Sequence, residues 1–223
     1  MEHVVVNSFF LVRGRAGGAL PSGQSDARPG GTLSSWNRPS APGPRDDAFP
    51  FDGVVQTPRC AQAGFADLGP ALRETLDLPA SIRMDAVQRV VVPGTAPIKL
   101  MIFSRKAPHL SSRAYSEYWF GRHKQVVLQQ RDFMQFVRGY RQNHVMPESV
   151  CTGTEVPTPD RDRFDGVIEQ WFDSIDDALR AYQTPGYQIH TRGDEPNFLA
   201  VGTSIATFVD ELALAPAFSN PPN

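Results

Sequence analysis

Apolar residues in this chain gather in short runs of β-branched and aromatic side chains, which is the pattern of β-strands. Two of these runs, at residues 3–13 and 82–92, bracket the first part of the chain. Two others, at residues 98–105 and 200–209, bracket the second part. The pattern therefore predicts two units that each begin and end in a strand.

The second unit has room for a helix, two strands and another helix between its outer strands. Residues 111–130 place bulky side chains at helical spacing, after a serine that can cap the first turn. Strands are predicted at residues 139–145 and 167–172, and a second helix at 175–182. The order βαββαβ is that of a ferredoxin-like unit.

Motifs of the second unit recur in the first. Phe51-Asp52-Gly53-Val54-Val55-Gln56 is echoed by Phe164-Asp165-Gly166-Val167-Ile168-Glu169. A phenylalanine followed at the same interval by an Ala-Leu-Arg triplet also occurs in both units, starting at Phe65 and Phe172. Because both matches come in the same order, we infer a tandem duplication.

The duplication divides the chain into a first copy at residues 1–96, a second copy at 97–213 and a tail at 214–223. The first copy is degenerate, because residues 14–50 are rich in Gly, Pro, Ser, Arg and Asp. This composition predicts a long loop with little helix or strand in place of the first helix. Packing of the loop through Trp36 would instead indicate a lid over the second copy.

Four segments of the second copy resemble the EthD domain of the dimeric α/β-barrel superfamily. They are residues 99–105, residues 118–127, Tyr140-Arg141-Gln142-Asn143-His144 and residues 164–172. The resemblance implies an α+β fold in which two ferredoxin-like units pair their sheets into a dimeric α/β-barrel arrangement, here within one chain. Relatives include monooxygenases, polyketide cyclases, decarboxylases, dehydratases and haem proteins, so the fold does not settle the reaction.

In this superfamily the active site lies between a sheet and its own helices. His123 shares a predicted helical face with Tyr115 and Trp119, which places an imidazole in an apolar cleft. Such a histidine is suited to general acid or base catalysis, and a core histidine bonded to backbone is the alternative. The first copy has no counterpart of His123, so one competent cleft is expected per chain.

The strands supply the other candidate residues. Alternation puts Tyr140, Gln142 and His144 on one face, which suggests a cleft wall, and puts Glu169 and Trp171 together on a face of the next strand. A buried Glu169 would need His144 or Arg141 as its partner. We expect His123 to move the proton while Tyr140 and His144 stabilise the developing charge. The expected substrate-binding residues are Tyr115, Trp119, Gln142, Glu169, Trp171 and Arg192.

Charge and composition narrow the choice of partners. Lysine and arginine (22) nearly balance aspartate and glutamate (24), which leaves no basic surface for a nucleic acid. The apolar stretches are far shorter than the ~20 residues that cross a bilayer. The start Met1-Glu2-His3 lacks the basic residues of a secretory signal, and Cys60 and Cys151 form no disulfide framework. We expect a cytoplasmic protein, with a homodimer left open.

These observations favour a small lyase that acts on an aromatic or polyketide-like acid by decarboxylation or a related proton-transfer elimination. No residue spacing marks a metal site, and no cofactor is expected. The alternatives are a cofactor-free or haem-dependent monooxygenase and a non-catalytic carrier of a hydrophobic intermediate. The leading hypothesis predicts that Tyr140, Gln142, His144 or Glu169 lies within hydrogen-bond reach of His123, directly or through a water.

Overall fold

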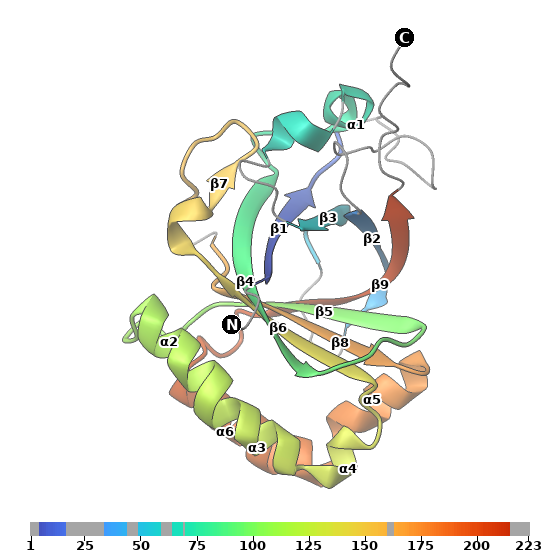
Figure 1. The fold of residues 1–223 in the computed structure, drawn as a ribbon, viewed down its shortest axis with the longest axis vertical. Coiled ribbons are helices and arrows are strands. Elements are labelled where there is room, and N and C mark those ends of the chain that lie inside the picture. Colours follow the sequence, from blue (N-terminus) through green and yellow to red (C-terminus); the bar gives the residue numbers. More distant parts are fainter. Residues whose placement is uncertain are drawn as a thin grey trace.

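Eight β-strands form a closed ring in the computed structural model of this protein (Figure 1). The structure describes residues 5–16, 34–43, 49–58, 64–68, 70–159 and 163–214. The strands of the ring are β1 (Val5–Val12), β2 (Ser34–Pro42), β3 (Gly53–Pro58), β4 (Ile82–Val92), β5 (Ile98–Ser104), β6 (Gly139–Val145), β8 (Gly166–Phe172) and β9 (Ile205–Leu214).

All neighbouring strands of the ring run antiparallel. Their order is β1-β3-β2-β9-β5-β8-β6-β4, and β4 also pairs with β1, which closes the ring. A two-residue strand, β7 (Cys151–Thr152), is added at the start of β4. The predicted α+β barrel is therefore confirmed.

The two halves of the chain arrange their strands in the same way. In each half the spatial order is fourth, first, third and second strand: β4-β1-β3-β2 and β9-β5-β8-β6. The two four-stranded sheets meet where β2 pairs with β9 and where β4 pairs with β6. This correspondence supports the inferred duplication, and the division into copies stays a prediction.

The Phe-Asp-Gly motifs perform the same task in both halves. The Asp52 carboxylate accepts a hydrogen bond from the backbone N–H of Gly14 at 2.8 Å. The Asp165 carboxylate accepts one from the backbone N–H of Lys106 at 2.9 Å. Each aspartate thus ties the start of the third strand to the residue just beyond the first strand, and this is a structural role.

The expectation of a long loop at residues 14–50 is wrong for its described part. Strand β2 lies between β3 and β9, and the backbone of Trp36 is in register with Val55 and Leu212. Its register shifts between Pro39 and Ala41, as expected where a proline offers no N–H to the ladder. Residues 17–33 and 44–48 lie outside the described residues.

Helices cover the outer face of the second sheet (Figure 1). After β5 come α2 (Ser112–Tyr118), a π-helical turn (Trp119–His123), α3 (Lys124–Gln129) and α4 (Arg131–Met134). After β8 come α5 (Ile175–Gln183), a second π-helical turn (Tyr187–Thr191), α6 (Arg192–Asp194) and a 3-10 turn (Glu195–Asn197). The first half has a 3-10 turn (Phe65–Leu68) and α1 (Pro70–Thr75), and Pro147–Ser149 forms another 3-10 turn. No helix in the described part of the chain is long and apolar enough to cross a membrane.

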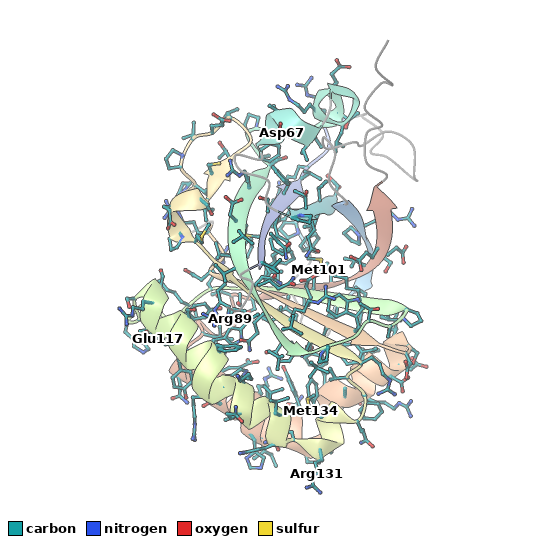
Figure 2. All side chains as sticks on the ribbon, viewed as in Figure 1. Asp67, Arg89, Met101, Glu117, Arg131 and Met134 are labelled. Carbon is teal, nitrogen blue, oxygen red and sulfur yellow. The ribbon has the colours of Figure 1, made fainter. Side chains whose placement is uncertain are left out.

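The alternation of side chains along each strand separates two cores. Met101, Phe103 and Val167 belong to the cluster inside the ring, where Figure 2 labels Met101. Leu100 and Phe172 belong to the cluster between the sheet and the helices. The second core also holds the site.

Candidate active site

A cleft lies between the second sheet and its helices. It encloses about 40 Å³, which is room for about three ordered waters. A single aromatic ring needs a cavity of ~150 Å³, so a substrate of that size requires the wall to move outward. The lining residues are Ile102, Trp119, His123, Val127, Phe133, Tyr140, Ile168, Gln170, Tyr182, Tyr187, Thr191, Glu195 and Phe198.

Two π-helical turns supply part of this wall. The Ser111 hydroxyl accepts from the N–H of Ala114 and caps α2, and the helix then widens at Trp119–His123. The second π-helical turn, Tyr187–Thr191, contributes Tyr187 and Thr191 to the same cleft. Single π turns inside helices are frequent at functional sites because they change the direction of side chains.

The predicted helical face is buried as expected. The side chains of Tyr115, Trp119 and His123 all turn toward the sheet, and His123 is 5% exposed. The ring of Phe198 packs against the imidazole, with 4.5 Å between ring centroids. His123 therefore lies in an apolar surrounding on the wall of the cleft.

The polar partner of His123 is Asp194. The imidazole Nδ1 lies 2.8 Å from Asp194 Oδ2. The other carboxylate oxygen accepts hydrogen bonds from Tyr118 Oη at 2.7 Å and Asn197 Nδ2 at 3.0 Å. The bond to His123 and the other two donors lower the pKa of Asp194 to about 2. An ionised Asp194 holds the proton on Nδ1, so Nε2 is the basic nitrogen.

The sequence prediction did not name Asp194 as a partner of His123. Of the described residues, Asp194 bonds its ring, and no direct bond joins it to Tyr140, Gln142, His144 or Glu169, while a contact through a water stays a prediction. Asp194 lies in the segment after the second helix, where the sequence singled out Arg192. That arginine is exposed, and its nearest polar contact is Gln188 at 3.5 Å. The binding role expected for Arg192 stays a prediction.

Tyr140 and Gln142 face the helices, as alternation predicted. Tyr140 lines the cleft, and its hydroxyl accepts a hydrogen bond from Gln142 Nε2 at 2.8 Å. Burial raises the pKa of Tyr140 to about 12, so the phenol is neutral at physiological pH.

His144 belongs to a different hollow. It lines a wider space of about 250 Å³ together with Arg89, Tyr115 and Ser116, and its Nδ1 lies 2.8 Å from Ser116 Oγ. The indole of Trp119 packs on its ring, with 4.5 Å between centroids. Burial, aided by the charge of Arg89, lowers the pKa of His144 to about 3. The structure therefore does not bring His144 and Tyr115 to the cleft of His123.

Glu169 and Trp171 point into the ring and not into the cleft. Glu169 is fully buried, with its carboxylate 2.8 Å from Lys99 Nζ and 2.8 Å from Asn143 Nδ2. Its predicted partners, His144 and Arg141, make no direct bond with it. Trp171 lies under the charges of Lys99 and Arg141. Both residues belong to the barrel interior, because they occupy the strand positions opposite Ile168 and Gln170.

Among the described residues, no group of three or more His, Cys, Asp or Glu side chains could hold a metal ion.

Residues 107–202 match the sequence model of the EthD domain. This part of the second half is therefore similar to an EthD domain. The match contains both His123 and Asp194, so the helix side of the cleft lies within the matched segment. The resemblance predicted from the motifs is confirmed, whereas no curated protein sequence matches the chain.

Two solved structures resemble the whole chain. One, from Lactobacillus acidophilus NCFM and described as a "putative monooxygenase", has 7% identity and a TM-score of 0.51 over 96% of this chain and 97% of that one. The other, an "anthrone oxidase-like protein", has 10% identity and a TM-score of 0.56 over 99% and 98%. At such low identity the likeness concerns the fold alone.

Proposed function

We propose that this protein is an enzyme that removes a proton from an aromatic or polyketide-like substrate bound in the helix–sheet cleft. The observation that carries the proposal is the His123–Asp194 pair, with 2.8 Å between Nδ1 and the carboxylate. A carboxylate on Nδ1 fixes the tautomer whose Nε2 can accept a proton, and it stabilises the imidazolium that results.

The composition of the cleft favours an uncharged substrate. Its described wall has no lysine or arginine that could pair with a carboxylate. Two acidic side chains, Glu195 in the wall and Asp194 behind His123, would repel one. The rest of the wall is mainly aromatic and aliphatic. A hydroxylated aromatic or polyketide-like ketone fits these properties better than the acid that the sequence suggested.

Loss of the proton can lead to two classes of reaction. In a lyase, the electrons of the broken bond expel a leaving group, which is the chemistry inferred from the sequence. In a cofactor-free oxygenase, the same anion reacts with O2. This second function is favoured because two structural neighbours are described as a "putative monooxygenase" and as an "anthrone oxidase-like protein".

The test compares His123→Ala with wild type on a panel of aromatic and polyketide-like ketones, with product analysis and an oxygen electrode. Removing a general base typically costs ~100- to 10,000-fold in rate. His190→Ala is the matched control, because His190 is exposed. A His123→Ala enzyme with a turnover rate within a few-fold of wild type would remove His123 from the mechanism.

Product without O2 uptake identifies the lyase, and stoichiometric O2 uptake identifies the oxygenase. Binding without turnover, unchanged in His123→Ala, would identify a carrier.

A further inference from the structure

We infer that Tyr140 is a catalytic hydrogen-bond donor that holds a carbonyl oxygen of the substrate, so that His123 takes its proton from a carbon next to that carbonyl. The inference rests on the proposed function, since it needs His123 as the base. It narrows the ketone of that proposal to one with an acidic C–H bond next to its carbonyl.

The hydrogen bonds of Tyr140 leave its proton without a partner in the protein. A phenol has one proton to donate and lone pairs that accept. Gln142 Nε2 donates to the Tyr140 oxygen at 2.8 Å. The Trp119 indole beside it can only donate, so it offers no acceptor for this proton. No described residue accepts the Tyr140 proton, and the side chain lines the cleft.

The orientation of Gln142 supports this assignment. Its side chain is fully buried, and its Oε1 has no hydrogen-bond partner among the described residues. The amide nitrogen is the atom that faces the Tyr140 hydroxyl, so Oε1 does not receive the Tyr140 proton.

The other tyrosines of the cleft differ from Tyr140 in this respect. Tyr182 Oη donates to Gln170 Oε1 at 2.6 Å. Tyr187 Oη donates to Glu195 Oε1 at 3.4 Å. Both protons are therefore engaged within the protein, whereas that of Tyr140 is available to a ligand.

The two groups together define a balanced proton transfer. His123 Nε2 takes the proton, the electrons of the C–H bond form a C=C bond, and the carbonyl π electrons move onto oxygen. The resulting enolate oxygen accepts the hydrogen bond from Tyr140, and no oxidant is needed for this step. A preorganised donor in a dry site binds the enolate more strongly than the ketone, which lowers the barrier. β-Dicarbonyl polyketides and anthrone-type aromatic ketones belong to this class.

The test measures exchange of the acidic C–H hydrogens of anthrone in D2O by NMR, without oxygen. Tyr140→Phe keeps the ring and removes the donor, and it should slow exchange by ~100- to 1,000-fold, as loss of one oxyanion donor does elsewhere. Tyr115→Phe is the matched control, because Tyr115 lies outside this cleft and its hydroxyl bonds Ser104, and it should stay within several-fold of wild type. Thermal unfolding of both variants reports whether they fold.

The outcomes separate the two proposals. If His123→Ala abolishes exchange and Tyr140→Phe matches wild type, the proposed function stands and the inference is overturned. If wild type exchanges anthrone no faster than buffer, both fail. A binding experiment adds a readout without turnover: wild type should bind 2-naphthol with a lowered pKa, because Tyr140 favours the naphtholate, and Tyr140→Phe should lose this shift. If bound 2-naphthol has the same pKa in wild type and in Tyr140→Phe, the inference is also overturned.

Discussion

Asp194→Asn removes the negative charge of the carboxylate but keeps the shape of the side chain. Asparagine can keep an oxygen for Tyr118 and Asn197, the two donors that bond Asp194 Oδ1. It then presents an N–H to His123 Nδ1, which must become an acceptor. The imidazole proton therefore moves to Nε2, and the base is lost. In serine-protease triads the same exchange costs about 10,000-fold, so a loss of ~100- to 10,000-fold is expected here.

The lowered pKa of Asp194 also limits how much Asp194→Asn can reduce the free energy of unfolding. A shift from 3.8 to about 2 corresponds to about 2.5 kcal/mol, at about 1.4 kcal/mol per pH unit. Because the folded-state pKa is depressed, this contribution is present above about pH 4 and is lost as the pH falls through about 2. Asparagine keeps part of the hydrogen bonding, so ~2.5 kcal/mol is an upper bound for the loss at neutral pH.

Three measurements check this prediction. They are turnover of a ketone substrate, the tautomer of His123 by ¹⁵N NMR of the ring, and the free energy of unfolding in urea. Asp173→Asn is the control, since Asp173 forms a half-exposed pair with Arg138, and such pairs contribute at most ~1 kcal/mol. An Asp194→Asn enzyme with nearly full activity and an Nδ1-protonated His123 would refute the reasoning.

Two further predictions concern groups outside the cleft. Lys99→Met should cost ~3–5 kcal/mol of unfolding free energy, because it leaves the Glu169 carboxylate buried without its cation, and adding Glu169→Leu should restore much of the loss. Urea unfolding tests this, and a single variant as stable as wild type would contradict it. The pKa of His144 is lowered to about 3, so its neutral form favours folding and stability should fall as the pH drops from about 6.5 toward 3. His144→Asn should flatten that part of the stability curve, and identical slopes would show that His144 does not cause it.

Local patterns in the sequence predicted much of the fold. Helical spacing placed Tyr115, Trp119 and His123 on one buried face, because a period of 3.6 needs no tertiary information. Alternation likewise placed Tyr140 and Gln142 together on the helix side of β6. Strand β2 escaped detection, because its prolines and small residues lack a strand pattern and its pairing comes from β3 and β9.

The sequence by itself determined the order of strands and helices in the second half, the resemblance to the EthD domain and the position of His123 on its helix, since each depends on neighbours along the chain. Only the tertiary structure decided which face of β8 turns inward, and so removed Glu169 and Trp171 from the site. It also brought Asp194 to His123 across 71 residues of chain. That contact depends on how the segment after α5 packs against α2 and α3, and no local period encodes such a long-range meeting.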